Sequence, residues 1–369
     1  MTTVLITGAN GFIGKNLIAT LNNDIQILKY DIDNSLEELK EFTRRADFVF
    51  HLAGVNRPLD TSEFEKGNKG FTELLLQFLK YNPKKVPVLM TSSIQAELDN
   101  PYGQSKKSAE LSVQEYSKET GASVYIYRLP NVFGKWCRPN YNSVVATWCY
   151  NVSHGLPIQI NNPDTELNLV YVDDVIQEFI NAFNGSESRS EDDYCFVPRT
   201  FSATLKQVAD TLNAFRESRN TLIIPSFKGE FERFLYATYL SYLPENKFGY
   251  ELEMKHDQRG WLAEFIKSPS IGQLFISRTK PGITRGNHWH HTKVEKFLVI
   301  EGEAVIRFRK IDAKEIIEYR VSGDKLEVLD IPTGYTHSIE NVGNTDVITL
   351  FWADEIFNPD KPDTYYLEV

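Results

Sequence analysis

Hydrophobic positions in the first half of the chain, up to about residue 185, alternate between short apolar runs and helical patterns. The apolar runs of strand length are TVLITG, ADFVFHLAG, VPVLMTSS and SVYIYRLP. Helical periodicity appears in LIATL, FTELLLQFL and SAELSVQEY, and a helix is expected to start at Phe12. Strands that alternate with helices predict an α/β domain with a parallel sheet and helices on both faces.

The pattern changes in the second half of the chain. Residues 203–242 look mainly helical, and SYLPENKFGYEL then interrupts the pattern with Pro, Asn and Gly. Beyond Met254 the chain consists of short strands divided by turns, which is typical of an all-β sandwich or barrel. A length of 369 residues also favours two domains. We therefore expect domains at residues 1–245 and 250–369.

Composition narrows the choice of partners and compartment. Hydrophobic residues make up 41% of the chain, charged residues 24%, and the net charge is −10. This charge argues against nucleic acid or an anionic membrane as the main partner, although backbone amides at a helix start can still bind a nucleotide. Cys137, Cys149 and Cys195 have no CxxC spacing and indicate reduced thiols. Without a signal segment or a membrane-spanning run, a soluble cytoplasmic protein is expected.

A glycine-rich turn follows the first predicted strand. Gly8, Gly11 and Gly14 lie in TGANGFIG, between the strand VLI and a helix. Glycine at these positions permits a tight turn, the approach of a pyrophosphate and close helix packing. Asp31 ends the second strand, where a ribose hydroxyl would bind. A tight turn without a ligand is the plainer alternative, but the strand–turn–helix context favours a dinucleotide site.

A tyrosine and a lysine have the spacing of one helix face. Tyr102 and Lys106 in YGQSK are four residues apart, so the ammonium is expected near the phenol, where it would lower the phenol's pKa. Such a phenol can protonate a carbonyl oxygen while hydride arrives at carbon, and Ser93 at a strand end can hold the same oxygen. The alternative is a solvated Tyr–Lys pair.

Six motifs occur in this order along the chain: TGANGFIG, HLAG, TSSIQA, YGQSK, RLPNVFG and LVYVDDV. As a set, over roughly residues 1–245, they resemble the extended short-chain dehydrogenase/reductases that act on nucleotide sugars, with a Rossmann-type doubly wound sheet. The resemblance implies a catalytic set of Ser93, Tyr102 and Lys106, with Arg128 and Asn131 near substrate or cofactor phosphate. Gly54 replaces the usual alanine of HLAG, and the sugar-binding part after LVYVDDV is short. The implied cofactor contacts are Gly8, Asn10, Gly11, Phe12, Ile13, Gly14, Asp31, Leu52, Ala53, Tyr102 and Lys106.

The form of the cofactor stays open between NAD and NADP. Asp31 favours NAD because a carboxylate repels a 2′-phosphate, whereas Lys15 and Lys29 could attract one. A biosynthetic reductase is expected to use NADPH, which we favour.

Two spaced motifs near the end of the chain predict a metal site. G-x5-H-x-H-x4-E-x6-G places His288, His290 and Glu295, and P-x-G-x2-H-x3-N places His337. Alternate residues of a strand point the same way, so the first two histidines can face one interior. Three imidazoles and one carboxylate suit zinc, iron, manganese or nickel, of which we favour zinc. Structural or exposed histidines are the alternative.

These motifs resemble those of the cupin family, small β-barrels, over about residues 250–369, with Leu326 in place of a usual glycine. DQRGWLAEF and TRGNHWH also resemble metal-free nucleotide-sugar 3,5-epimerases. That second resemblance implies substrate contacts by Arg259, Glu264 and Arg285 and makes His288 the base. His288 is therefore a candidate for both ligand and base.

Together the motifs resemble the CapF-type bifunctional enzymes of bacterial capsule synthesis. This resemblance implies a UDP-linked 2-acetamido-2,6-dideoxy-4-hexulose that the cupin epimerises at C3 and the first domain reduces at C4. The implied product is UDP-2-acetamido-2,6-dideoxy-L-talose, a precursor of N-acetyl-L-fucosamine, and a homodimer is expected. Two alternatives remain: a single-function reductase with a binding or dimerising cupin, and a binding protein with an inactive reductase fold.

Overall fold

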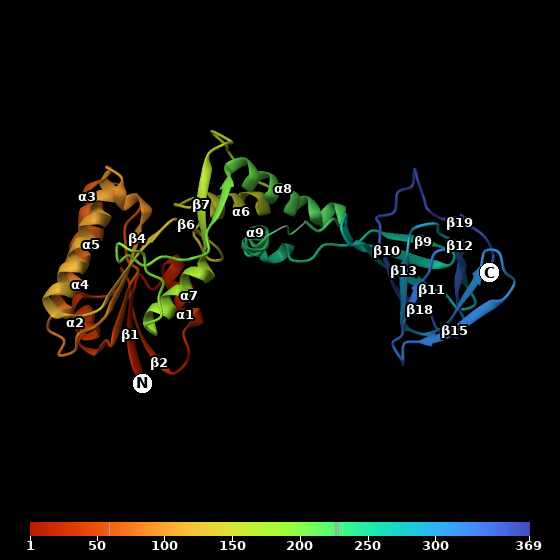
Figure 1. Ribbon diagram of the computed structural model, residues 1–369, viewed down its shortest axis with the longest axis horizontal. Helices are drawn as coiled ribbons and strands as arrows, with labels where there is room; N and C mark the ends of the chain where they lie inside the picture. The colour runs from red at the N-terminus through yellow and green to blue at the C-terminus, as the bar shows by residue number, and fades with distance from the viewer. Residues whose placement is uncertain (59, 226, 228) are drawn as a thin grey trace. The chain divides into compact units, whose positions relative to one another are not determined.

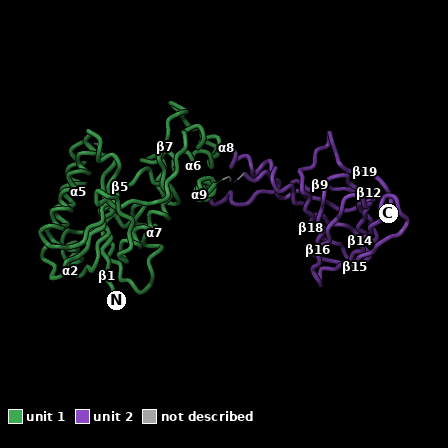
Figure 2. Tube along the Cα trace, in the orientation of Figure 1, with its two compact units in different colours: residues 1–212, 229–244 green, residues 213–228, 245–369 purple. Residues whose placement is uncertain are grey.

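The computed structural model describes residues 1–58, 60–225, 227 and 229–369. Two units are present, each built from two stretches of the chain (Figure 2). The first contains Met1–Leu212 and Gly229–Pro244, and the second contains Asn213–Lys228 and Glu245–Val369. Segment 213–228, expected in the first domain, belongs to the second unit because backbone hydrogen bonds tie it to strand β10. Lys267 N–H donates to Leu222 O at 2.8 Å, and Ile224 N–H donates to Lys267 O at 2.9 Å.

The first unit is built on a parallel sheet with strand order β2-β1-β3-β4-β5. Helices α2, α4 and α5 pack together on one face and α1 packs with α7 on the other (Figure 1). The strands are β1 Thr2–Thr7, β2 Ile25–Tyr30, β3 Phe48–His51, β4 Val88–Ser93 and β5 Val124–Leu129. The helices are α1 Phe12–Thr20, α2 Leu36–Arg45, α3 Ser62–Phe64, α4 Phe71–Leu79, α5 Pro101–Thr120 and α7 Val172–Phe183, with η1 Glu65–Gly70 and η2 Ile94–Glu97. The strand order reverses at β1, and ligands bind beside such a point at the carboxyl ends of the strands.

A smaller lobe of this unit follows β5. It contains a sheet of order β6-β7-β8, from β6 Asn131–Phe133, β7 Glu166–Tyr171 and β8 Phe201–Thr204. Its helices are α6 Val144–His154 and α9 Glu230–Leu240, which pack on each other, while α8 Leu205–Thr221 runs from the first unit into the second.

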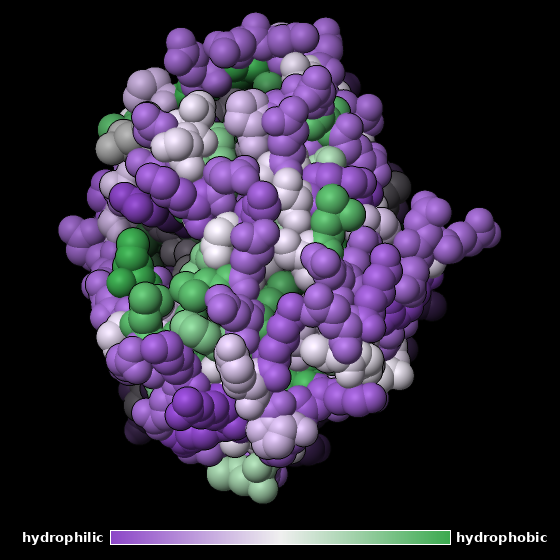
Figure 3. All heavy atoms as spheres, turned by 90° about the vertical axis from the view of Figure 1, so that its left-hand side faces the viewer, coloured by the Kyte–Doolittle hydropathy of each residue, from purple (hydrophilic) through white to green (hydrophobic). Residues whose placement is uncertain are grey.

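Hydrophobic residues of the first unit are buried between the sheet and its helices. Leu5, Val49, Leu75, Val88 and Ile126 are among the residues of this core. The face of the unit drawn in Figure 3 carries mainly hydrophilic side chains, with hydrophobic ones in small groups. Across the described residues, no helix combines the length and apolarity needed to cross a membrane.

The second unit is an all-β domain of two sheets, with orders β16-β13-β18-β11-β10-β9 and β15-β14-β17-β12-β19. Residues from both sheets, such as Phe297, Phe351, Phe308 and Ile339, form its core. The strands are β9 Met254–Asp257, β10 Gly260–Ser268, β11 Gly272–Thr279, β12 Thr284–Trp289, β13 Glu295–Glu301, β14 Glu303–Lys310, β15 Ile316–Ser322, β16 Val328–Ile331, β17 Tyr335–Asn341, β18 Val347–Ala353 and β19 Tyr365–Tyr366, preceded by the short helix η3 Glu245–Lys247. The predicted order of folds, a parallel α/β domain before a cupin-like β domain, is confirmed.

Candidate active site and metal centre

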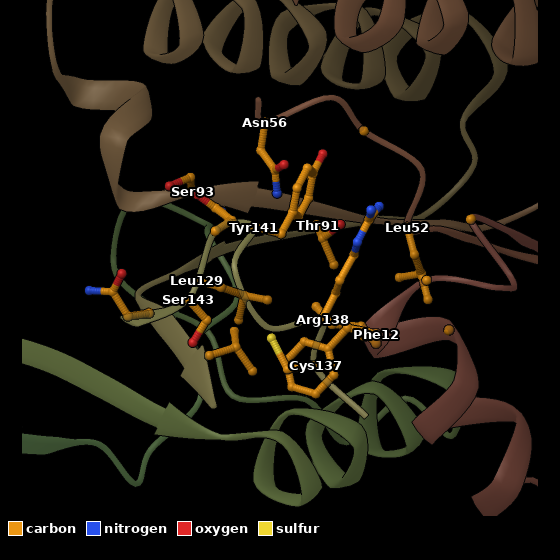
Figure 4. A pocket seen from close by; sticks show the side chains of 18 of the residues that line it. Phe12, Leu52, Asn56, Thr91, Ser93, Leu129, Cys137, Arg138, Tyr141 and Ser143 are labelled. Atoms are coloured by element: carbon orange, nitrogen blue, oxygen red, sulfur yellow. The ribbon is translucent and has the colours of Figure 1, made fainter. Parts of the chain in front are cut away.

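A pocket of about 1210 Å³ opens at the carboxyl ends of the first unit's strands (Figure 4). It collects most of the residues that the sequence motifs single out, although these are up to 123 positions apart. The predicted site residues among its lining are Gly8, Asn10, Gly11, Phe12, Ile13, Gly14, Asp31, Leu52, Ser93, Tyr102, Lys106 and Asn131.

The glycine turn is shaped by close backbone contacts. Gly8 has a φ of 68°, and a Cβ atom there would lie 2.8 Å from the backbone nitrogen of Ala53. A Cβ atom at Gly14 would lie 2.3 Å from the carbonyl oxygen of Gly8. Side chains are therefore excluded, and the N-terminus of α1 faces a cradle of the kind that holds a pyrophosphate. This glycine-lined cradle fits a dinucleotide cofactor.

Two predicted cofactor contacts have structural roles in this turn. Ala53 does not line the pocket; its N–H donates to Thr7 Oγ1 at 3.3 Å and its backbone packs against Gly8. Asp31 lines the pocket, and its carboxylate also accepts the N–H groups of Asn10, at 2.7 Å, and Ile32, at 2.8 Å. Asp31 thus ties the end of β2 to the glycine turn.

Ser93, Tyr102 and Lys106 come together from β4 and α5. Burial raises the pKa of the Tyr102 phenol above its ordinary value and outweighs the lowering effect of the Ser93 hydroxyl. The Lys106 ammonium is buried and donates to the Thr91 carbonyl at 3.1 Å. Burial lowers the pKa of Lys106 to about 8, against a smaller opposing effect of Glu110. The expectation that Lys106 lowers the pKa of Tyr102 is therefore wrong, because burial dominates and the ammonium bonds to a carbonyl.

Gly54 has a specific place beside this lysine. A Cβ atom at Gly54 would lie 2.9 Å from Lys106 Nζ and 3.1 Å from Asn68 Oδ1. The exchange of alanine for glycine in HLAG therefore gives the ammonium room beside the loop that follows β3.

Asn68 supports the site from behind the pocket lining, and the motifs did not indicate it. Its Oδ1 accepts Val55 N–H at 2.8 Å, and its Nδ2 donates to Val55 O and to Ser105 Oγ, each at 2.9 Å. Ser105 Oγ in turn donates to the carbonyl of Tyr102 at 2.8 Å. This buried amide connects the loop after β3 to the helix that carries Tyr102, and its only sequence signal is the glycine on either side in GNKG.

Arg128 is not a phosphate ligand in this structure. It is absent from the pocket lining, and its guanidinium donates to both oxygens of Glu110, at 3.0 and 2.7 Å. Glu97, at 2.9 Å, and Tyr194, at 2.7 Å, accept its other N–H groups. Because the guanidinium is bound by the buried carboxylate of Glu110, the predicted role near phosphate is corrected. Arg128 instead links strand β5 to helix α5. Asn131 remains in the pocket, with its Nδ2 donating to Asn168 O at 3.2 Å.

The far wall of the pocket was not predicted. Its backbone has positive φ at Trp136, 68°, and Asn140, 55°. Figure 4 shows Arg138 and Tyr141 in the middle of the view, between Ser93 and Leu52. A run rich in Gly, Pro, Asn and aromatic residues, GKWCRPNYN, is the only sequence signal for this wall. The wall residues are Trp136, Cys137, Arg138, Pro139, Tyr141, Asn142, Ser143 and Tyr242.

The second unit brings His288, His290, Glu295 and His337 together. One ligand atom from each lies within 4.8 Å of all the others. His288 lies on β12, His290 just beyond it, Glu295 starts β13 and His337 lies on β17, so both sheets contribute. Glu295 Oε2 is 3.3 Å from His290 Nε2 and 3.4 Å from His337 Nε2.

The chemistry of this cluster fits a divalent metal ion. Among the residues that the structure describes, neither ring nitrogen of the buried His337 has a hydrogen-bond partner, and a buried polar atom normally needs one. Burial raises the pKa of Glu295, but His290, His337 and Lys293 outweigh this and hold it below its ordinary range. Burial, assisted by His337, lowers the pKa of His288 to about 4, so its imidazole is neutral and can act as a ligand.

The predicted substrate-binding residues of the second unit belong to two separate sets of ion pairs. Arg259 donates to Asp257 Oδ2 through Nε at 2.9 Å and Nη2 at 2.5 Å, and Arg285 Nη2 lies 3.8 Å from Asp257 Oδ1. Glu264 instead forms ion pairs with Lys267 at 2.8 Å and Lys255 at 3.8 Å. The two arginines thus share a carboxylate, and Glu264 is held by lysines.

The first unit therefore has the fold of a short-chain dehydrogenase/reductase, and the second is a cupin-like domain. Residues 4–194 match the NAD dependent epimerase/dehydratase family, and residues 255–365 match the polysaccharide biosynthesis C-terminal domain. The chain belongs to the NAD dependent epimerase/dehydratase family.

Known relatives match both units at once. UDP-2-acetamido-2,6-beta-L-arabino-hexul-4-ose reductase of Pseudomonas aeruginosa is 44% identical over 368 residues, which cover 99% of this chain and 98% of that protein. The crystal structure of the capsular polysaccharide assembling protein CapF from Staphylococcus aureus is 51% identical, with a TM-score of 0.94, and covers 99% of this chain and 100% of that one. A structure of CapF with the inhibitor 3-isopropenyl-tropolone is 47% identical, with full coverage of both chains and a TM-score of 0.90.

Proposed function

We propose that the chain is a bifunctional nucleotide-sugar enzyme of capsular polysaccharide precursor synthesis. Its substrate is a UDP-2-acetamido-2,6-dideoxy-4-hexulose, which the cupin domain epimerises at C3 and the first unit reduces at C4 with NADPH. The product is UDP-2-acetamido-2,6-dideoxy-L-talose. The observation that carries the proposal is one chain holding both a Ser93–Tyr102–Lys106 set in a nucleotide-type pocket and a buried cluster of three histidines and a glutamate. The name of the 44% identical relative, a reductase of a UDP-linked hexul-4-ose, supports the substrate class.

Reduction depends on how the first unit holds and protonates the sugar's C4 ketone. The bound nicotinamide cofactor supplies the hydride. Ser93 and Tyr102 both bind the ketone oxygen, and the Tyr102 hydroxyl gives its proton to that oxygen as the alkoxide forms. Lys106, whose ammonium donates to the Thr91 carbonyl, supplies a positive charge in the pocket that favours the developing negative charge.

Cations in the pocket support a phosphorylated cofactor and a nucleotide diphosphate substrate. Lys15 lines the pocket at the glycine turn, and the Asp31 carboxylate is already bound by two backbone amides, which lessens its repulsion of a 2′-phosphate. Arg138 lies on the opposite wall and is the residue we assign to the diphosphate of the sugar nucleotide.

Epimerisation uses the acidity of the C3 proton next to the ketone. His288, His290, Glu295 and His337 are the residues that would hold a divalent ion, for which zinc is our choice. Such an ion supplies Lewis acidity that stabilises an enolate. Because the His288 imidazole converges with the other three ligand atoms, we assign it to the metal where an ion is bound. In a metal-free cluster His288 would instead be the base that takes the C3 proton and returns it on the other face. The two arginines at Asp257, Arg259 and Arg285, are proposed to bind the substrate's phosphates.

A single-function reductase is the second candidate, favoured by the relative whose name specifies only reduction. The test is incubation of the 4-keto sugar nucleotide in deuterated water, with and without NADPH. We expect deuterium uptake at C3 without the cofactor, and its loss in His290→Asn, while reduction of a sugar already epimerised at C3 survives. Asparagine is a poorer ligand than imidazole, so metal content should fall from about one ion per chain.

Three outcomes decide between the candidates. If the wild type showed no exchange at C3, the single-function reductase would be the remaining candidate. Exchange without bound metal would favour His288 as the base of a metal-free epimerase. Undiminished exchange in His290→Asn would make the cluster structural.

A further inference from the structure

The HxH motif leaves its sheet before the second histidine. Strand β12 ends at Trp289, and its pairing with β17 shifts register between Gly286 and His288. Asn287, at this bulge, has a φ of 58°. A bulge re-aims the side chains beside it, and His290 lies beyond the strand's last paired residue. The pairing of β12 with β17 therefore ends before His290. The backbone of His290 is held by the N–H of Gly334, which donates to its carbonyl at 3.1 Å, but its imidazole needs other contacts.

The segment 363–369 supplies such contacts on the other edge of β12. Its strand β19 pairs antiparallel with His288 and Trp289, and the two strands lie side by side in Figure 1. Leu367 N–H donates to the carbonyl of the bulge residue Asn287 at 3.0 Å. Thr336 Oγ1, on β17 beside His337, donates to the carbonyl of Leu367. The segment thus bridges the two strands that carry histidines of the cluster.

Asp363 binds the second histidine directly through its backbone. His290 Nδ1 lies 2.5 Å from the carbonyl oxygen of Asp363. A carbonyl can only accept a hydrogen bond, so Nδ1 carries a proton, and in the neutral imidazole Nε2 keeps its lone pair. Nε2 is the nitrogen that lies 3.3 Å from Glu295 Oε2, inside the cluster. The bond therefore selects the tautomer that can bind a metal.

The carboxylate of Asp363 binds the turn 291–293, which follows His290 in the chain. Its Oδ1 accepts His291 N–H at 2.9 Å, and its Oδ2 accepts the N–H groups of Thr292, at 2.7 Å, and Lys293, at 2.9 Å. Thr292 Oγ1 donates to the same Oδ2 at 2.9 Å. These three residues lie between His290 and Glu295, so one aspartate fixes the chain between two candidate ligands.

We infer that Asp363, with the segment that follows it, is a positioning residue of the metal centre. It clamps the turn 291–293 through its carboxylate and orients the imidazole of His290 through its carbonyl. The inference rests on the metal centre of the proposed function and adds to it a distant residue on which metal affinity depends. Nothing in the HxH motif indicates Asp363, which lies 73 positions beyond His290.

The test is a Zn²⁺ titration of the metal-free, full-length protein in competition with a chromogenic chelator. Asp363→Ala should raise the dissociation constant for Zn²⁺ by about 10–100-fold, the range found when a group that orients a metal ligand is lost. Asp360→Ala is the matched control, because Asp360 is exposed and no described residue donates a hydrogen bond to its carboxylate. The control should bind Zn²⁺ as the wild type does. The Co²⁺-loaded proteins give a second readout, since a displaced imidazole changes the visible absorption of the ion.

A merely structural role is separated by comparing thermal stability with and without Zn²⁺. We expect Asp363→Ala to lose most of the Zn²⁺-dependent rise in Tm, whereas a purely structural tie would lower both Tm values equally. Should the alanine variant fail to fold, Asp363→Asn, which keeps one acceptor oxygen, should still weaken Zn²⁺ binding about 10-fold. Wild-type affinity in a folded Asp363 variant would overturn the inference while leaving the metal centre intact. A wild type that takes up no Zn²⁺ would overturn the metal centre and this inference with it.

Discussion

The buried charge of Lys106 should destabilise the folded protein, although the proposed reduction needs this residue. Replacement of Lys106 by methionine tests this. The Lys106 ammonium is buried and, among the described residues, donates one hydrogen bond, to Thr91 O; burial lowers its pKa from 10.5 to about 8. The difference of about 2.5 pKa units corresponds to about 3 kcal/mol against keeping the charge in the folded protein. Methionine removes this cost but also the hydrogen bond, worth about 1 kcal/mol. We therefore expect Lys106→Met to raise the free energy of unfolding by about 2 kcal/mol at neutral pH while abolishing reduction.

The stability difference between the wild type and Lys106→Met should depend on pH. Above about pH 8 the folded wild type loses the Lys106 proton while the unfolded chain keeps it up to pH 10.5. Since the unfolded state then binds more protons, wild-type stability rises with pH across this window and is lost again as the pH falls through 8. By about pH 9.5 the wild type should have regained about 2 kcal/mol, so the advantage of Lys106→Met should vanish.

The assay is urea unfolding without nucleotide, followed by far-ultraviolet circular dichroism, because the helices lie mainly in the first unit. A gain of about 2 kcal/mol corresponds to a rise in Tm of about 4–8 °C for a domain of this size. Lys107→Met is the matched control, since Lys107 is exposed on the same helix and its replacement should change little. A Lys106→Met variant less stable than the wild type at neutral pH, or an advantage that does not change with pH, would refute the reasoning.

Four further predictions concern the site, its supports and the assembly. Tyr102→Phe should abolish hydride transfer with nearly unchanged cofactor binding, because the ring stays and only the proton donor goes; most of the activity surviving in steady-state assays would exclude Tyr102 from the mechanism. Gly11→Val should sharply weaken cofactor binding in a fluorescence titration, because even its Cβ would lie 3.1 Å from Gly8 O; an unaltered affinity would make the turn a packing feature. Glu110→Ala should lower the free energy of unfolding by about 3–5 kcal/mol, since it leaves the Arg128 guanidinium without its buried partner, and a loss below 1 kcal/mol would contradict that partnership. The protein should sediment as a homodimer, because exposed sheet edges of the β domain need covering, and a monomer at micromolar concentration would contradict this.

Several features of this protein follow from short stretches of sequence alone. Helix α1 starts at Phe12 as the glycine spacing predicts, and Tyr102 and Lys106 lie on one helix, α5. The HxH and P-x-G-x2-H spacings select histidines whose ligand atoms the fold brings within 4.8 Å. These features are predictable because backbone periodicity acts over a few residues, so neighbours in sequence determine which side chains share a face.

Other features depend on segments that meet only in the folded chain. The motif around Arg128 predicts a residue near phosphate. In the folded chain, however, its guanidinium donates hydrogen bonds to the Glu110 carboxylate of helix α5. Burial decides the pKa of Tyr102, and the unpredicted wall around Arg138 closes the pocket. Asp363 reaches His290 from 73 positions away, and segment 213–228 joins the second unit through β10. Motif spacing specifies which chemical groups are present, but desolvation and hydrogen-bond partners are properties of the packed surroundings, so only the tertiary structure decided which of those groups are free to act.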